Sequence, residues 1–190
     1  EITRFSLGTA AFGGLYSSVR EEDCTATVQE ALSRGVKLID TAPHYGKGVS
    51  EERVGRAVRG RARSEFSIST KVGRLLLPAE HDEDDFFLDA NPRRVRSFNF
   101  SGGAIRKSLE ESLERLELES VEILFIHDPD DHEDQALTEA YPELEKMRSE
   151  GLIKAIGIGM NQSRIPTKFV KETDIDCVLI AGRYSLLDQS

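Results

Sequence analysis

The chain has 190 residues, with 25 Lys and Arg against 34 Asp and Glu, which gives a formal net charge of -9 at pH 7. This acidic balance argues against a nucleic-acid partner, because binding to a phosphate backbone needs clustered Lys and Arg. Hydrophobic residues make up 38% of the chain, which is enough for a packed core. The sequence contains no run of about 18 apolar residues, so it predicts no membrane span.

Short apolar segments alternate with segments of helical period in the first half of the chain. The predicted elements are a strand over 5–10, a helix over 21–34, a strand over 36–40, a helix that begins near Ser50 and a strand over 66–72. Val28, Ala31 and Leu32 share one face of the first helix, and Gly35 ends it. Ser50 is expected to cap the second helix, whose first turn carries Glu51 and Glu52.

The same alternation continues in the second half. The predicted elements are a helix opened by Ser101, a strand over 121–126, a helix around 137–147, a strand over 153–159, a short helix over 165–172 and a strand over 177–181. Pro142 must start or kink the helix in which it lies, because proline cannot donate a helical hydrogen bond.

Near-continuous apolar strands between amphipathic helices predict a parallel sheet covered by helices. A doubly wound open sheet and a (β/α) barrel both have this pattern. The glycine-rich turn over 8–14 matches neither G-x-G-x-x-G nor G-x-x-x-x-G-K-[ST], the phosphate-binding motifs of open sheets. We therefore predict an α/β fold, a (β/α)8 TIM barrel, of which residues 1–190 cover about six βα units as a single incomplete domain.

A complete barrel has eight strands, so this prediction includes a truncated barrel whose two edge strands lack partners. The longest predicted irregular stretch is 73–99, which is longer than an ordinary βα loop and is expected to be a functional loop over the barrel mouth. The acidic run over 80–85 within it is expected to be solvated, as is the acidic stretch over 128–134.

Ionisable side chains stand where the predicted strands end, which is where (β/α) barrels carry their chemistry. The second strand ends at Asp40, and its loop carries Tyr45. The third strand ends at Lys71 and the fourth at His127. These four side chains are therefore expected to converge on one mouth.

Together the four groups support proton transfer at a carbonyl or hydroxyl oxygen. Tyrosine has a pKa of about 10, and a nearby cation stabilises the phenolate and lowers that pKa. Lys71 is the candidate cation, Asp40 would hold it, and His127 would donate a hydrogen bond to the substrate oxygen. Tyr45 is then the general acid in reduction and the general base in oxidation. None of these groups is a hydride source, so the set implies a redox cofactor.

Three segments, LIDTAPHYG over 38–46, STKVG over 69–73 and GLIKAIG over 151–157, resemble the aldo-keto reductase superfamily. The resemblance implies a TIM barrel that uses NAD or NADP without a Rossmann domain. It also implies a catalytic tetrad of Asp40, Tyr45, Lys71 and His127. The cofactor-binding residues that it implies are Thr9, Ala10, Asp40, Gly159 and Asn161, and Asn161 falls where the family hydrogen bonds the nicotinamide carboxamide.

Further segments resemble one branch of that family: KVGRLL over 71–76, SFNFS over 97–101, IHDPD over 126–130, GMNQ over 159–162 and AGRYSLL over 181–187. This branch holds aldose 1-dehydrogenases and pyridoxal 4-dehydrogenases. The resemblance implies a small-molecule substrate, an L-fucose-like aldose or a pyridoxal hemiacetal, oxidised at C1 to a lactone. The family's segments that distinguish NAD from NADP would follow residue 190, so the sequence predicts either cofactor.

Two other functions remain compatible with these residues. A metal-dependent TIM-barrel hydrolase would use Asp40, His44, His127 and Asp128 as ligands, although it would have no use for Lys71 beside Tyr45. The other is a truncated, catalytically inactive barrel with a regulatory role or none.

Two cysteines, Cys24 and Cys177, lie far apart in apolar segments. This placement favours two buried free thiols over a disulfide or a metal site. The N-terminal residues also lack the pattern of a secretion signal, so we expect a cytoplasmic protein.

Overall fold

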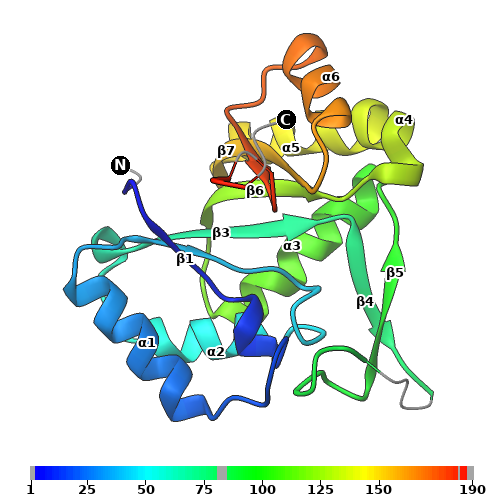
Figure 1. Ribbon diagram of the computed structural model, residues 1–190. Helices are drawn as coiled ribbons and strands as arrows, with labels where there is room; N and C mark the ends of the chain where they lie inside the picture. The colour runs from blue at the N-terminus through cyan, green and yellow to red at the C-terminus, as the bar shows by residue number, and fades with distance from the viewer. Residues whose placement is uncertain (1–2, 81–84, 184, 188–190) are drawn as a thin grey trace.

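The computed structural model of the protein describes residues 3–80, 85–183 and 185–187 (Figure 1). Six parallel strands form a curled sheet in chain order, each strand paired with the next. They are β1 (Ser6–Gly8), β2 (Leu38–Asp40), β3 (Ser67–Val72), β6 (Val121–His127), β7 (Ile153–Met160) and β8 (Cys177–Ile180). The predicted parallel sheet of a partial (β/α)8 barrel is confirmed.

Helices connect consecutive strands of this sheet, as predicted. They are α1 (Glu21–Ser33), α2 (Val49–Val58), α3 (Gly102–Leu116), α5 (Tyr141–Glu150) and α6 (Arg164–Glu172). Short helical turns complete the connections: η1 (Ala10–Gly13), η2 (Arg63–Glu65), η3 (Asp130–His132), α4 (Glu133–Gln135) and the π-helical η4 (Ala136–Ala140). Helix α1 contacts α2, α2 contacts α3 and α3 contacts α5, so the helices follow the order of the strands.

Helix α3 illustrates how the sequence specifies this packing. Ser101 caps it by accepting a hydrogen bond from the Ala104 backbone N–H, as predicted. Ile105 and Leu109 are buried on its inner face, one helical turn apart. Pro142 is the second residue of α5 and follows directly on the π-helical η4, so the helical run changes type where proline cannot donate a hydrogen bond.

The stretch predicted to be irregular contains an antiparallel hairpin instead. Strands β4 (Arg74–Pro78) and β5 (Arg94–Phe98) pair with each other and project from the barrel mouth (Figure 1). Gly73 has a φ of 105°, and a Cβ there would clash with the ring of Phe100, so this position requires glycine. The hairpin was missed because its strands are separated by a long connection rather than by a two-residue turn.

Ser50 does not cap α2, contrary to prediction. The helix begins at Val49 after Gly48, whose φ is 94°. Ser50 lies inside the first turn and its side chain is fully buried. Its hydroxyl instead forms hydrogen bonds with Thr9 and Thr41, which directly follow β1 and β2.

The acidic run of 80–85 falls partly on residues 81–84, which lie outside the described residues. Asp85 is among the described residues, and the prediction that it is solvated is wrong, because its side chain is buried. Its carboxylate forms an ion pair with Arg96 and lies 3.6 Å from the ammonium nitrogen of the buried Lys47. Both partners come from segments that flank the mouth, so Asp85 ties the hairpin to the βα loop after β2.

The two cysteines are free thiols. Cys24 is fully buried, as predicted, whereas Cys177 is only partly buried on the edge strand β8. Within the described ranges, no helix combines the length and apolar character needed to cross a membrane.

Candidate active site

The carboxyl ends of the parallel strands bring the predicted catalytic residues to one edge of the sheet. Asp40 pairs with Ser69 across β2 and β3, and Lys71 pairs with Phe125 across β3 and β6. His127 pairs with Gly159 across β6 and β7. Residues distant in sequence therefore meet because the strands run in the same direction and in register.

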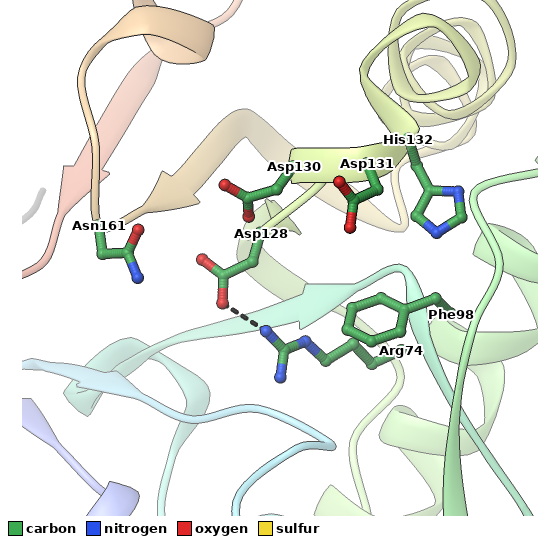
Figure 2. A pocket seen from close by; sticks show the side chains of 7 residues that line it. All are labelled: Arg74, Phe98, Asp128, Asp130, Asp131, His132 and Asn161. Carbon is green, nitrogen blue, oxygen red and sulfur yellow. Dashed lines mark hydrogen bonds and ion pairs between the residues drawn. The ribbon is translucent and has the colours of Figure 1, made fainter.

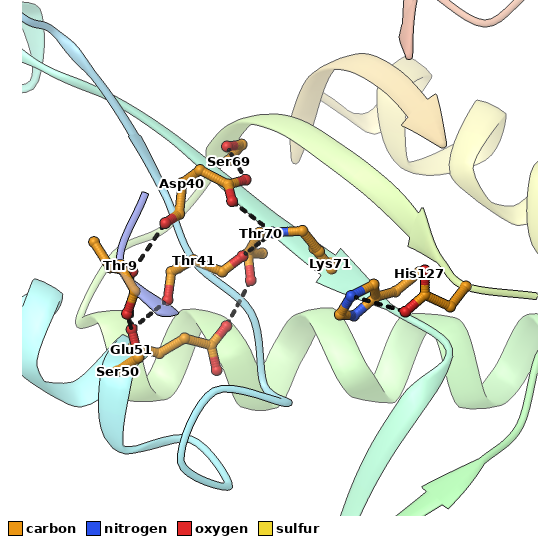
Figure 3. A network of polar contacts seen from close by, with 10 residues as sticks. Thr9, Asp40, Thr41, Ser50, Glu51, Ser69, Thr70, Lys71 and His127 are labelled. Atoms are coloured by element: carbon orange, nitrogen blue, oxygen red, sulfur yellow. Dashed lines mark hydrogen bonds and ion pairs between the residues drawn. The ribbon is translucent and has the colours of Figure 1, made fainter. Parts of the chain in front are cut away.

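Lys71 is buried beneath this edge with its charge compensated (Figure 3). Its ammonium nitrogen lies 2.6 Å from Oδ2 of Asp40 and donates a second hydrogen bond, of 2.8 Å, to the Thr41 carbonyl. Burial disfavours the ammonium, but attraction to Asp40 and Tyr45 outweighs it and raises the pKa of Lys71. Lys71 is therefore a permanent cation in this site.

Ser69 fixes the other oxygen of the Asp40 carboxylate. Its hydroxyl donates to Oδ1 of Asp40 at 2.7 Å, and its side chain is buried. The two oxygens of Asp40 thus have separate partners, one neutral and one cationic. This arrangement holds the carboxylate in one orientation beneath Lys71.

Tyr45 lies over Lys71, whose ammonium nitrogen is 4.8 Å from the centre of the tyrosine ring. Burial raises the pKa of Tyr45, and the charge of Lys71 opposes that rise. The predicted influence of Lys71 therefore has the expected direction. The sequence predicts a lowered pKa for Tyr45, and this prediction is wrong. The net shift is upward, because desolvation of the phenolate outweighs the attraction of Lys71.

His127 completes the group as a neutral imidazole. Burial and the nearby cations Lys71 and Arg74 lower its pKa well below the ordinary value. Its Nε2 lies 3.5 Å from Oδ2 of Asp128. Its Nδ1 is buried with no hydrogen-bond partner among the described residues. Because a neutral imidazole can donate or accept a hydrogen bond and His127 lines the cavity described below, it is suited to bind an uncharged oxygen.

A layer of hydroxyl groups supports Asp40 from below (Figure 3). Thr9 donates to the Asp40 carbonyl at 2.8 Å, and its oxygen lies 2.8 Å from that of Ser50. Ser50 is also 3.0 Å from the Thr41 hydroxyl and donates to the Thr9 carbonyl at 2.8 Å. Because Thr9 is fully buried, its side chain acts in this layer rather than at the mouth.

A cavity of about 130 Å³ opens above the tetrad. Tyr45, Lys71 and His127 supply its polar wall, and Gly159 and Asn161 line it as well. Asp128 and apolar atoms of Met160, Leu179 and Ala181 complete the lining. The lining therefore includes Gly159 and Asn161 from the predicted cofactor set, whereas Asp40 and Thr9 lie beneath and Ala10 lies in the neighbouring turn η1.

Sequence reasoning assigned no role to Arg74, although the segment KVGRLL contains it. Its guanidinium forms an ion pair with Asp128, which also lines the cavity above the tetrad (Figure 2 shows the pair). Asp128 was expected in a solvated stretch, but three quarters of its side chain is buried. The spacing of Arg74, three residues after Lys71, was the one available signal.

The hydrolase alternative would take its metal ligands from Asp40, His44, His127 and Asp128, all within the described ranges of the chain. No group of three or more His, Cys, Asp or Glu side chains there is arranged to hold a metal ion. His44, a ligand in the hydrolase alternative, instead packs its ring against Tyr45, Phe87 and His127.

Comparison with known proteins adds independent information. Residues 4–190 match the aldo/keto reductase family. The chain is 41% identical over 196 residues to D-threo-aldose 1-dehydrogenase of a Pseudomonas species, and 34% identical over 210 residues to pyridoxal 4-dehydrogenase of Microbacterium luteolum. These matches cover 99% of the chain but only 59% and 60% of the two relatives.

The fold is similar to that of a glycerol dehydrogenase structure from Gluconobacter oxydans. That match has a TM-score of 0.72 at 31% identity and covers 93% of this chain and 50% of the other. The sequence and structural matches thus agree on the architecture, and both relate this chain to part of a longer barrel.

Proposed function

This chain belongs to the aldo/keto reductase family, and we propose that it carries the catalytic half of an NAD(P)-dependent aldose 1-dehydrogenase. The reaction would oxidise the C1 hydroxyl of an L-fucose-like sugar, or of a pyridoxal hemiacetal, to a lactone. The observation that carries this proposal is the buried Lys71, paired with Asp40 and lying against Tyr45 at a cavity.

The names of the relatives support the substrate class. The relatives include D-threo-aldose 1-dehydrogenase and pyridoxal 4-dehydrogenase, and a third, L-galactose dehydrogenase of Arabidopsis thaliana, is 34% identical over 161 residues. The substrates of all three can present a hydroxyl at a hemiacetal carbon, which is the group that the tetrad would deprotonate.

The residues at the mouth fit the nicotinamide end of a dinucleotide. The amide of Asn161 can pair with a carboxamide, and Met160 and Leu179 offer apolar contact to a flat ring. A Cβ on Gly159 would meet Lys71 and Phe125 no closer than 3.9 Å, so glycine leaves room there without being required by the fold. When bound, NAD or NADP supplies the acceptor for the C1 hydride.

Each member of the tetrad then has one task. Tyr45 accepts the proton of the C1 hydroxyl as that carbon is oxidised, and Lys71 stabilises the resulting charge distribution. Asp40 keeps Lys71 charged and oriented. The neutral His127 hydrogen bonds the substrate oxygen and positions it. Ala10 and Asn161 would contact the cofactor, and Thr9 would act through Asp40.

The expected cytoplasmic location and single domain are part of the same proposal. Two free cysteines and the absence of a disulfide among the described residues fit a reducing compartment. The six consecutively paired strands are consistent with one domain over 1–190.

Turnover by the purified chain tests the proposal. L-fucose, other aldoses and pyridoxal would each be offered with NAD and with NADP, while nicotinamide absorbance is followed and lactone is identified by mass spectrometry. Lactone formed in step with reduced cofactor is the expected result. If protein shown to be folded by circular dichroism gives no turnover with any pair of substrate and cofactor, the catalytically inactive barrel would be favoured instead.

A further inference from the structure

A second cavity, of about 290 Å³, adjoins the first one at the barrel mouth (Figure 2). The two cavities share Asp128 and Asn161 as lining residues. A ligand that places one hydroxyl beside Tyr45 would therefore extend naturally into this second space. Arg74 and Phe98 form one of its walls.

Arg74 and Phe98 are held together by the hairpin. They are paired across β4 and β5, and the guanidinium carbon of Arg74 lies 4.9 Å from the centre of the Phe98 ring. Arg74 donates a hydrogen bond to Oδ2 of Asp128. Its Nε is buried and has no partner among the described residues. A ligand cannot reach this buried Nε, but a guanidinium has five N–H donors and Arg74 lines the cavity, so its terminal N–H groups retain capacity for a further acceptor.

Asp128 is held in an unusual conformation between this arginine and the tetrad. Its φ is 44°, in the left-handed region that residues with a side chain seldom adopt. Its backbone N–H is anchored by a 3.0 Å hydrogen bond to the Gly159 carbonyl. The same carboxylate oxygen faces Arg74 and, at 3.5 Å, Nε2 of His127. Asp128 therefore connects the second cavity to the catalytic group.

The charge of the second cavity excludes one class of ligand. Asp128, Asp130 and Asp131 all line it, against the single guanidinium of Arg74. Asp128 already neutralises that guanidinium, so a phosphate or carboxylate entering here would face uncompensated negative charge. Neutral hydroxyl groups, in contrast, can donate to the carboxylates and accept from Arg74.

We propose that Arg74, Asp128 and Phe98 form the subsite for the ring hydroxyls of the substrate beyond C1, and that it selects a neutral polyhydroxylated ring over a phosphorylated one. The inference rests on the proposed function for the position of C1. The sugar's hydroxyls exchange hydrogen bonds with the Arg74–Asp128 pair, and its C–H face packs on the exposed ring of Phe98. Binding energy gained here holds C1 at Tyr45.

Direct binding tests the subsite separately from catalysis. Saturation-transfer NMR would measure the affinity of the chain for L-fucose and for L-fucose 3-phosphate, whose phosphate lies on a ring hydroxyl beyond C1, with NAD and without it. We expect Arg74→Met to weaken L-fucose binding by about tenfold or more, since hydrogen bonds to charged groups are being lost. The phosphorylated sugar should bind the parent chain more weakly than L-fucose does.

Two further variants keep the test decisive if Arg74→Met folds poorly. Phe98 is 51% exposed, so Phe98→Leu should fold normally yet weaken sugar binding. Arg34→Met is the matched control, because Arg34 directly follows α1, is 76% exposed and forms an ion pair with Glu30 of that helix. No L-fucose binding by the parent chain, equal binding of the phosphorylated sugar, or unchanged affinity in both Arg74→Met and Phe98→Leu would overturn the subsite.

Turnover distinguishes failure of the subsite from failure of the proposed function. The cyclic hemiacetal 2-hydroxytetrahydropyran has the C1 hydroxyl but no other ring hydroxyl. For Arg74→Met, kcat/KM should fall about tenfold further for L-fucose than for this compound, mainly through KM. Equal losses for both would reject the subsite while leaving the dehydrogenase intact. Sugar binding lost in Arg74→Met without turnover by the parent would support the subsite and reject the function.

Discussion

The ammonium nitrogen of Lys71 lies 2.6 Å from a carboxylate oxygen of Asp40, and the lysine side chain that carries it is almost completely enclosed. A buried lysine without such a partner would lose its proton. The pair instead fixes a positive charge directly beneath the ring of Tyr45. Under the proposed function, this charge is in place before a substrate arrives.

Removing the Tyr45 hydroxyl should remove the proton acceptor. We expect Tyr45→Phe to lower kcat by about 10²-fold or more, which is the usual contribution of a general acid or base. Cofactor affinity, measured by fluorescence titration of the reduced cofactor, should stay within about threefold. Tyr16→Phe is the control, because Tyr16 is 85% exposed. Turnover by Tyr45→Phe close to that of Tyr16→Phe would exclude Tyr45 as the proton acceptor.

The pH profile of oxidation should report the influence of Lys71 on Tyr45. Oxidation needs the deprotonated phenol, and the charge of Lys71 opposes the rise that burial imposes on the pKa of Tyr45. Lys71→Met removes that charge, so the pKa of Tyr45 rises further and the rising limb of kcat/KM moves to higher pH. Lys107→Met, at an exposed position on α3, should leave the limb in place. If the pH profiles of kcat/KM for Lys71→Met and Lys107→Met coincide, Lys71 does not influence the pKa of Tyr45.

Stability should fall as the solution is acidified, in part because of His44. Burial and the nearby Arg74 and Arg96 lower the pKa of His44 to about 3 in the folded chain, whereas an unfolded histidine has a pKa of about 6.5. Between these values the unfolded chain binds a proton that the folded chain does not. The free energy of unfolding should therefore decrease from pH 6.5 toward pH 3.

His44→Phe tests this origin while keeping an aromatic ring against Tyr45 and Phe87. Urea denaturation at a series of pH values should give a shallower loss of stability in the variant. Part of the slope should remain, because burial also lowers the pKa of His127. Parallel curves for the variant and the parent would show that His44 does not contribute.

A buried ion pair behind the sheet should matter more to stability than an exposed one. Glu51 is fully buried and accepts hydrogen bonds from Arg115 at 2.7 Å and Thr70 at 2.6 Å. Arg115→Met leaves that carboxylate without its cation and should lower the free energy of unfolding by about 3–5 kcal/mol. Arg34→Met removes a solvent-exposed pair and should change it by less than about 1 kcal/mol. Similar denaturation midpoints for the two variants would contradict the structural role of Glu51.

Much of the architecture follows from the sequence because its signals are local. Hydrophobic runs such as 121–126 and the helical stripe through Ile105 and Leu109 repeat with the periods of strands and helices. Apolar strands and amphipathic helices alternate strictly along the chain. This alternation predicts a parallel sheet, because helices on the sheet then bury both faces of each strand. The hairpin of β4 and β5 had no comparable signal, since its pairing depends on residues about 20 positions apart.

The amino-acid sequence by itself determined which segments become strands of the parallel sheet. It also determined that Asp40, Lys71 and His127 stand at strand ends and Tyr45 in the loop after the second strand, because these positions follow from local patterns. Only the tertiary structure decided how strongly burial opposes the Tyr45 phenolate, that Ser69 holds Asp40, and that Arg74 meets Asp128 beside His127. Those relationships depend on desolvation and on distances between separate strands. Neither quantity exists until the chain has folded.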